Sequence, residues 1–337
     1  MFRIGRTVMK TLALILLVLL LVLTGSLWQA ARPFFIQVAP PAPVTVVIRP
    51  GEPFSNIARQ LHEVGVVADR RSISLLAQWR EATGRIQAGP YAFSAAATPG
   101  QVLDRLLKGD VIRTRITIPE GWTVREIAER LAATGVADRK AILTLAHDPA
   151  FARSLGVLAP GLEGYLFPET YLLVAGTPPE QILATLVGEF RRHLTPELEG
   201  AAKARGLSVH QLVTLASIVQ MEAGTRAEMP LIAGVFANRL KRRMPLQADP
   251  TVIYGIPDFN GNLTRKNLQE WTPYNTYRIA GLPPGPIASP GDDALQAAAH
   301  PATVDYLYFV ARGDGTHAFT ANLVDHNRAV RRYQLHR

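Results

Sequence analysis

The strongest pattern along the chain is an uninterrupted apolar run close to its amino terminus. Residues 11–31 carry no charged side chain, and Leu12 to Leu23 consist only of Leu, Val, Ile and Ala. An α-helix rises about 1.5 Å per residue, so this run is about as long as a bilayer core is thick, roughly 30 Å. The pattern therefore predicts a transmembrane helix over residues 11–31.

Basic residues before the run predict its orientation. Three of them lie within residues 1–10: Arg3, Arg6 and Lys10. Because basic flanks stay in the cytoplasm, we expect a cytoplasmic amino terminus and an extracytoplasmic remainder, as in a single-pass protein of the inner (cytoplasmic) membrane. A cleaved signal peptide is the alternative. Ala30 and Ala31 form a poor cleavage site, and Trp28 fits an interfacial anchor, so we favour a retained helix.

After this run the pattern changes to a Pro-rich stretch and then to two similar strand–helix segments. Residues 32–43 predict a stiff, extended spacer that holds the next domain off the membrane. Residues 48–66 resemble residues 118–136, because each predicts a strand, a Gly turn and a helix. The matching apolar positions are Ile57, Ala58 and Leu61 in the first copy, and Ile127, Ala128 and Leu131 in the second.

The first copy belongs to a predicted small module over residues 44–110. Val44 to Ile48 is a β-branched strand candidate, and Thr98 with Pro99 predicts the start of a short helix that runs to Leu107. This strand–helix style resembles the LysM modules that bind N-acetylglucosamine polymers. A structural α+β module without sugar affinity is the alternative. Residues 111–157 are expected to form the second repeat, or a connector.

Composition narrows the class of protein. Of the 337 residues, 48% are hydrophobic and 19% are charged, which favours packed domains over disorder. The net charge of +9 is spread thinly and lacks a basic motif interleaved with aromatic residues, so nucleic acid is not an expected partner. The chain contains no cysteine, which excludes disulfides and cysteine–zinc sites. From about Leu158 onward, clusters of Gly, Pro, Tyr and Asn indicate the domain that carries the chemistry.

The most informative segment of this domain is a predicted helix that ends near Gly224. Ser208 and Gln211 fit a capping box at its start. At 100° per residue, one apolar stripe collects Leu212, Leu215, Ile218 and Val219. Glu222 falls on that stripe, where loss of solvation favours the protonated carboxyl that a general acid needs. A buried Glu that is paired with an Arg or capped by backbone groups is the alternative.

A second predicted helix and several polar loops follow. The helix starts at Pro230, with Asn238 and Arg239 near its end, and its expected inward face consists of Leu231, Val235, Phe236 and Leu240. A sugar site needs planar hydrogen-bonding groups beside aromatic faces. Four residues of the loops offer them: Gln247, Tyr254, Asn275 and Tyr277. Ordinary turn chemistry is the alternative for these loops.

Several of these motifs, taken together and in order, resemble the YceG family, the MltG-type endolytic murein lytic transglycosylases. They are Leu162-Glu-Gly-Tyr-Leu-Phe-Pro-Glu-Thr-Tyr171, Leu215-Ala-Ser-Ile-Val-Gln-Met-Glu222, Leu246-Gln-Ala-Asp-Pro-Thr-Val-Ile-Tyr-Gly255, Tyr274-Asn-Thr-Tyr277, Gly281-Leu-Pro-Pro-Gly285 and Ala298-Ala-His-Pro301. The resemblance covers the anchor, the small module and the last domain. Many members have two acidic residues on the catalytic helix, whereas this chain has Gln220 and Glu222. The resemblance therefore implies Glu222 as the catalytic residue.

Competing chemistries find less support in the sequence. No His-Glu-x-x-His, Gly-x-Ser-x-Gly or Walker motif occurs, and His300, His317 and His326 are isolated, as expected of core or turn residues. We therefore expect no metal and no cofactor. A membrane-anchored wall-binding scaffold is the alternative without catalysis, and a hydrolytic muramidase is the alternative enzyme.

These observations predict an α+β protein with an anchor, a LysM-like module and a mainly helical catalytic domain over residues 158–337. The resemblance implies as substrate the β-1,4 bond between N-acetylmuramic acid and N-acetylglucosamine in nascent peptidoglycan, which is expected to be cleaved to 1,6-anhydro ends. The resemblance implies a role in ending strand growth and partnership with peptidoglycan synthases (penicillin-binding proteins). With Glu222 as the catalytic residue, the expected substrate-binding residues are Gln247, Asn275, Tyr277, Tyr254, Asp249 and Glu163.

Overall fold

The computed structural model describes residues 6–335, so Arg3 and the last two residues of the expected catalytic domain lie outside it. The chain divides into two compact units, Met1–Arg113 and Thr114–Arg337. Within the described residues, helices accompany three two-stranded antiparallel sheets. The expected α+β class is confirmed.

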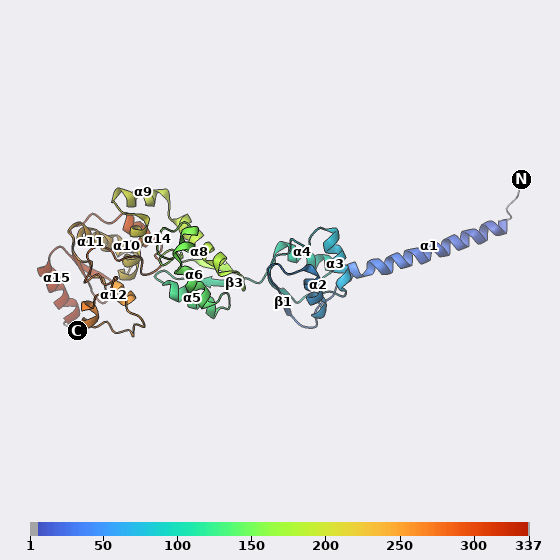
Figure 1. Ribbon diagram of the computed structural model, residues 1–337, viewed down its shortest axis with the longest axis horizontal. Helices are drawn as coiled ribbons and strands as arrows, with labels where there is room; N and C mark the ends of the chain where they lie inside the picture. The colour runs from blue at the N-terminus through green and yellow to red at the C-terminus, as the bar shows by residue number, and fades with distance from the viewer. Residues whose placement is uncertain (1–5, 336–337) are drawn as a thin grey trace. The chain divides into compact units, whose positions relative to one another are not determined.

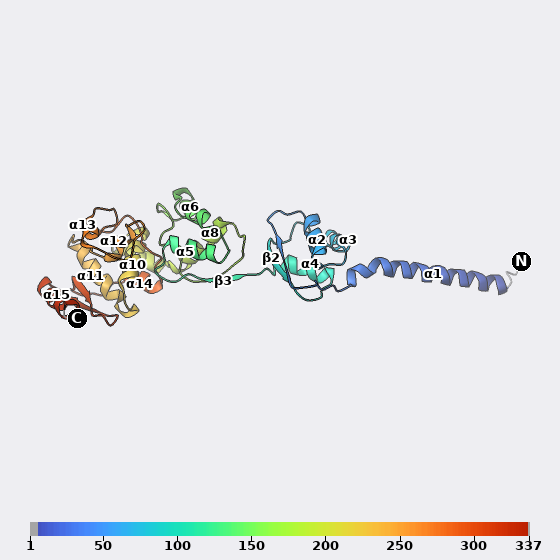
Figure 2. The same ribbon diagram turned by 90° about the horizontal axis from the view of Figure 1, so that it is seen from below.

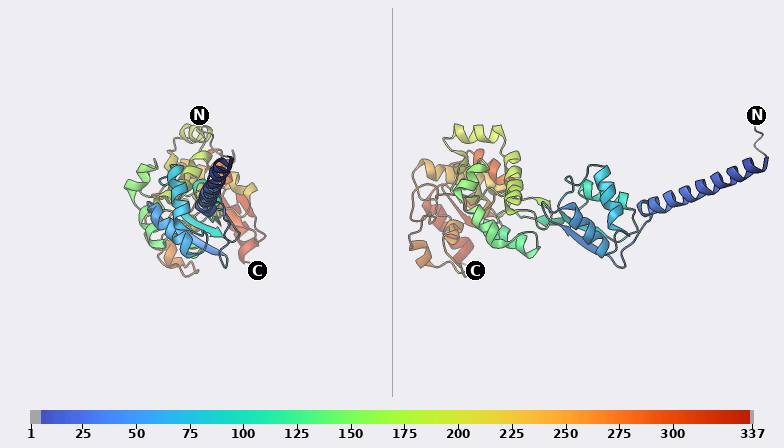
Figure 3. Two further views of the ribbon diagram at one scale, coloured as in Figure 1. Left: turned by 90° about the vertical axis from the view of Figure 1, so that its right-hand side faces the viewer. Right: turned by 45° about the vertical axis from the view of Figure 1, so that its right-hand side comes forward.

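The apolar run forms one long helix, α1 (Arg6–Phe35), which extends beyond the expected residues 11–31 at both ends and contains Pro33. Its apolar part, Met9–Phe35, has 27 residues, and the most apolar 18-residue stretch within it is not buried by other parts of the protein. At about 1.5 Å per residue it extends for about 40 Å, more than a bilayer core requires. Figures 1 and 3 show that α1 projects from the rest of the first unit as an isolated helix. The helix therefore fits a single-pass membrane anchor.

The stiff, extended spacer expected over residues 32–43 is not observed, because residues 32–35 belong to α1 and residues after them pack onto the rest of the first unit. The main chain of Val38 exchanges two hydrogen bonds of 3.0 Å with that of Ala97. Pro40 is buried, and Pro41 lies so close to Gly65 that a side chain there would meet it at 3.2 Å. Tertiary contacts thus override the extended preference of a Pro-rich segment.

The first unit is built on the strand pair β1 (Val44–Ile48) and β2 (Gly89–Phe93), which run antiparallel. Three helices pack on it: α2 (Phe54–Glu63), α3 (Arg70–Trp79) and α4 (Pro99–Lys108). The predicted strand at residues 44–48 is confirmed. The predicted helix start is confirmed as well, because Thr98 and Gln101 form a capping box with Pro99 in the first turn.

The second unit holds the remaining elements. Its first half consists of β3 (Thr114–Thr117), α5 (Val124–Ala133), α6 (Arg139–Ala146), α7 (Pro149–Ser154), β4 (Thr170–Leu173), α8 (Pro179–His193) and α9 (Pro196–Ala204). Its second half consists of α10 (Val209–Glu222), a 3-10 turn (Arg226–Glu228), α11 (Met229–Lys241), α12 (Asp249–Tyr254), α13 (Arg265–Gln269), α14 (Asp292–Ala299), β5 (Tyr308–Ala311), β6 (His317–Thr320), α15 (Leu323–Val330) and a π-helical turn (Arg331–Leu335).

The internal repeat is confirmed, and it extends further than expected. β1, α2, α3 and β2 recur in the second unit as β3, α5, α6 and β4, with α7 added before β4 and an antiparallel strand pair in each copy. In both copies the predicted apolar triplets of α2 and α5 are buried. The second copy is not a separate connector over residues 111–157, however. Its side chains share one continuous core with the rest of the second unit, from Ile116 to Ala299.

Helix α10 forms the centre of the second unit. It contacts α9, α11, α12 and α14, and α10, α11 and α14 lie together in Figure 1 (Figure 2 shows them from below). The predicted Ser208–Gln211 capping box is confirmed. Every residue from Leu212 to Val219 is buried, so the expected single apolar stripe underestimates the burial of α10. The buried hydroxyl of Ser217 has a hydrogen-bond partner, because it donates to the Thr214 carbonyl at 2.8 Å.

Candidate active site

Glu222 is the last residue of α10 and is half-buried. The next residue, Ala223, is extended, so the helix stops directly behind the carboxyl group. Gly224 then passes the turn between β5 and β6, where a side chain would lie 2.1 Å from the Gly315 carbonyl oxygen. Only glycine permits such a close approach. The buried helix and this tight crossing together hold the carboxyl group at one place.

The surroundings of Glu222 favour its protonated form. Burial is the largest cause, and the charge of Asp249 is the second; together they raise the pKa of Glu222 to about 8 from an ordinary 4.5. The charge of Arg239 and the backbone N–H of Asp249 act in the opposite direction and lower this pKa, but they do not compensate. Glu222 therefore carries its proton at neutral pH.

Asp249 begins the short helix α12 and brings Tyr277 to the site. The Tyr277 hydroxyl donates to a carboxylate oxygen of Asp249 at 2.6 Å. Burial and this hydrogen bond raise the pKa of the Tyr277 phenol, so it stays protonated. Glu222, Asp249 and Tyr277, which are far apart in sequence, thus lie within one network.

Arg239 is a residue of this site, although from the sequence it was expected only to lie near the end of a helix. It is buried, and its guanidinium group donates to the carbonyls of Leu307 at 2.7 Å and Leu246 at 2.9 Å. It also lies 5.2 Å from the centre of the Tyr308 ring. A signal for it existed, since Arg239 continues the apolar spacing of Ile232, Val235 and Phe236, just as Glu222 continues that of α10.

The buried face of α11 therefore differs from the expected one. Leu231 and Leu240 are only half-buried, whereas Ile232 and Arg239 are buried with Val235 and Phe236. The register turns α11 so that its arginine, and not its last leucine, points inward.

Gln247 is exposed and lies in a strained backbone conformation. Its φ of +51° is in the left-handed region that favours glycine. Its N–H donates to the Thr276 carbonyl at 3.1 Å, and its side-chain oxygen accepts from Arg239 at 3.2 Å. Such strain persists where neighbouring contacts impose it, and it is common at functional sites. The amide nitrogen of Gln247 makes no hydrogen bond within the described residues.

Asn275 lies at the same loop but has a different environment. It is completely buried, and its amide nitrogen donates to three carbonyls, with the shortest bond, 2.6 Å, to Glu270. Its oxygen accepts from the Tyr277 N–H at 2.9 Å. These surroundings favour a scaffold role for Asn275, in which it positions Tyr277. They do not favour the direct sugar contact that was expected from the sequence.

Glu163 and Tyr254 form a second polar cluster at the other end of α12. The Glu163 carboxyl group accepts from the Tyr254 hydroxyl at 3.1 Å and from the Val124 N–H at 3.0 Å. Burial raises the pKa of Glu163 to about 7 despite these bonds. The ring of Tyr254 packs on that of Tyr274, with centroids 4.8 Å apart. Because α12 has only six residues, the two clusters are separated along its axis by roughly 8 Å.

His317 and His326, two of the three isolated histidines, have structural partners. His317 bonds Glu228 at 2.8 Å, and His326 stacks on Tyr308. Between residues 6 and 335, no three His, Asp or Glu side chains gather as a metal site would require. The expectation of no metal and no cofactor stays a prediction.

Comparisons with known proteins identify the family. Residues 46–332 match the model of the YceG-like family. An endolytic murein transglycosylase of Bacillus subtilis is 33% identical over 306 residues, which cover 86% of this chain and 84% of that protein. One of Streptococcus pneumoniae is 31% identical over 322 residues; the match covers 85% of this chain and 58% of the longer streptococcal protein.

A solved structure agrees with this family match. The crystal structure of a YceG-like protein from Listeria monocytogenes is similar with a TM-score of 0.59 and 32% sequence identity. The similarity covers 85% of this chain and 98% of that one. The fold, the order of the motifs and these matches agree, and the chain belongs to the YceG-like family.

Proposed function

We propose that this protein is an endolytic lytic transglycosylase of peptidoglycan, with Glu222 as its catalytic acid and base. The observation that carries the proposal is the carboxyl group of Glu222, held at the end of a buried helix with its pKa raised to about 8. The names of the relatives from Bacillus subtilis and Streptococcus pneumoniae support the same reaction class.

The first step is proton donation. Protonated Glu222 gives its proton to the oxygen of the β-1,4 bond between N-acetylmuramic acid and N-acetylglucosamine. The bond between the muramoyl C1 and this oxygen breaks, and the leaving sugar departs with a new hydroxyl group. Proton transfer of this kind is most effective when the pKa of the acid lies near the working pH.

The second step closes a ring without water. Ionised Glu222 accepts the proton of the muramoyl C6 hydroxyl, and the freed oxygen bonds to C1, which yields a 1,6-anhydro end. Glu222 regains its proton, so one carboxyl group serves both steps. Because the attacking hydroxyl belongs to the same sugar, its high effective concentration contributes to the rate.

The neighbouring residues support the charge that develops during cleavage. The carboxylate of Asp249 and the hydroxyl of Tyr277 lie beside Glu222, where a sugar cation forms, and we assign them to its stabilisation. The unpaired amide nitrogen of exposed Gln247 suits a sugar hydroxyl. Glu163 and Tyr254 are assigned to a neighbouring sugar position at the far end of α12. Asn275 acts through Tyr277.

The remaining parts of the chain support a membrane location for this reaction. We propose that α1 spans the inner membrane with residues 1–10 in the cytoplasm and both folded units outside. The module over residues 44–110 is proposed to be LysM-like and to bind glycan strands. Growing strands made by peptidoglycan synthases are the proposed substrate, and their cleavage ends elongation.

Digestion of purified sacculi with the full-length protein tests this function. Mass spectrometry of the soluble products should find 1,6-anhydromuramoyl ends on fragments from within strands. A protein that binds sacculi and releases no fragments would be the scaffold alternative, and the proposal would be wrong.

A further inference from the structure

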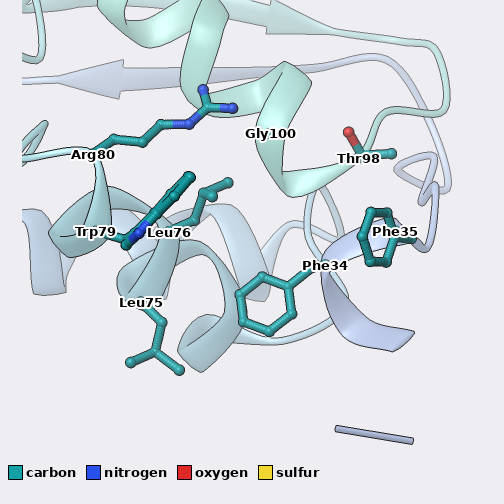
Figure 4. A pocket seen from close by; sticks show the side chains of 8 residues that line it. All are labelled: Phe34, Phe35, Leu75, Leu76, Trp79, Arg80, Thr98 and Gly100. Atoms are coloured by element: carbon teal, nitrogen blue, oxygen red, sulfur yellow. The ribbon is translucent and has the colours of Figure 1, made fainter. Parts of the chain in front are cut away.

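The first unit contains an apolar hollow where α1 ends. The hollow has a volume of about 610 Å³, in the range of small-molecule pockets. Its lining includes Phe34 and Phe35 from the last turn of α1, Leu75 and Trp79 from α3, and Arg80 after it. Figure 4 shows Phe34, Leu75 and Trp79 around the opening between the two helices.

The rim of this hollow is unusually apolar for a surface facing water. Leu75 is 55% exposed, Trp79 80% and Phe35 70%, although all three are large hydrophobic residues. Contiguous exposed apolar residues of this kind mark surfaces that contact a membrane or another protein. The hollow therefore calls for an apolar occupant.

The position of the hollow identifies that occupant. Phe34 and Phe35 belong both to its lining and to the apolar span Met9–Phe35. Helix α1 contacts α3 and α4 directly, and α3 lies beside the end of α1 in Figures 1 and 2. The hollow thus continues the surface of the membrane-spanning helix at the depth where a bilayer ends, and tryptophan is enriched at that depth.

Basic residues around the same helix fit the phosphates of lipid headgroups. Arg70 and Arg71 are exposed at the start of α3 and line a second hollow together with Leu75. Arg80 is partly exposed beside the apolar rim, where its guanidinium group bonds Asp104 at 2.6 Å. Its remaining N–H groups can donate to a phosphate. An apolar face bordered by arginines is typical of a helix that lies in the membrane interface.

We propose that α3 and the end of α1 form a second membrane contact, in which a phospholipid of the outer leaflet places an acyl chain in the hollow and its phosphate near Arg80. The first unit then rests on the bilayer, instead of standing off it on a spacer. The inference rests on the proposed membrane-spanning role of α1.

The absence of native cysteine makes a direct test simple, because one introduced thiol can carry one fluorophore. Leu75→Cys places the dye on the proposed contact. Val47→Cys is the matched control, because Val47 is 54% exposed and β1 lies on the side of the module away from α1 (Figure 1). Both full-length variants are reconstituted into vesicles of phosphatidylethanolamine and phosphatidylglycerol that contain lipids with a nitroxide on the acyl chain.

The nitroxide lipids should quench the dye at position 75 several-fold more than the dye at position 47, and Trp79→Cys should repeat the result of Leu75→Cys. Flotation of the vesicles reports the anchor separately. Floating protein with equal quenching at positions 75 and 47 would overturn the contact and leave the anchor in place. Protein that does not float with the vesicles would overturn both.

Discussion

The backbone N–H and the carboxylate of Asp249, the first residue of α12, both act on the carboxyl group of Glu222, the last residue of α10. This N–H favours the ionised form of Glu222, whereas the negative charge of the Asp249 side chain favours the protonated form. One residue thus supports both states of the carboxyl group. An acid that must become a base within one reaction needs this balance.

Replacement of Glu222 by Gln should abolish cleavage while the fold persists. The substitution keeps the shape but removes the transferable proton, and acid–base catalysis contributes about 10²–10⁴-fold. Product release from sacculi should fall at least that far, and circular dichroism should be unchanged. Glu197→Gln, at an exposed position in α9, is the matched control and should keep full activity. Substantial cleavage by Glu222→Gln would exclude Glu222 as the acid.

The dependence of activity on pH should report the raised pKa of Glu222. Because the protonated carboxyl group is the donor, kcat/KM should fall as pH rises through about 8. Asp249→Asn removes a charge that raises this pKa, so the alkaline limb should move to lower pH. Asp258→Asn is the control, since Asp258 is exposed and has a left-handed φ that Asn also adopts. An unmoved limb in Asp249→Asn would contradict the assigned role of Asp249.

The stability of the second unit should fall with rising pH. Glu222 has a pKa of about 8 in the folded state and about 4.5 in the unfolded state. Its favourable contribution to stability is therefore complete below pH about 4.5 and is lost as pH rises through about 8. Glu163 has the same effect on stability, but only up to pH about 7, because its pKa in the folded state is about 7. Urea unfolding between pH about 7 and about 8 should thus show a slope for the wild type. Glu222→Gln should flatten it, and an identical slope in both proteins would refute the shift.

Arg239 should be essential for stability as well as for the site. Arg239→Met keeps the apolar stem but leaves the carbonyls of Leu246 and Leu307 without their donor, which should cost about 3 kcal/mol or more. Arg239→Lys keeps the charge but lacks the planar fork, so it should rescue only part of this loss. The control is Arg242→Met, at an exposed position after α11. Equal urea midpoints for Arg239→Met and Arg242→Met would show that the network is not needed.

The elements predicted correctly from the sequence are those that depend on neighbouring residues. The strand at residues 44–48, the helix starts at Thr98 and Ser208, and the repeated helices all follow from local spacing. The packing of residues 38–41 could not be predicted from local spacing, because Pro40 and Pro41 lie against Gly65, and Val38 pairs with Ala97. Such contacts depend on where the chain returns in space, which local propensity does not contain.

The candidate site divides in the same way. A carboxylate in an apolar helix pattern is visible in the sequence, and the arginine at position 239 gives the same signal in α11. The difference between Gln247 and Asn275 is not visible, since both are amides in polar loops. Only the fold shows that the amide nitrogen of Asn275 donates to main-chain carbonyls, whereas Gln247 is exposed.

In the proposed mechanism the substrate's own hydroxyl, and not water, attacks the muramoyl carbon while Glu222 transfers the proton. Digestion of sacculi in oxygen-18 water, followed by mass spectrometry, tests it most directly. We expect muramoyl ends that contain no heavy oxygen, weigh one water less than hydrolysed ends and resist borohydride reduction. Reducible muramic acid ends that carry oxygen-18 would contradict it and would make the protein a muramidase, with Asp249 as the first candidate for a second catalytic carboxylate.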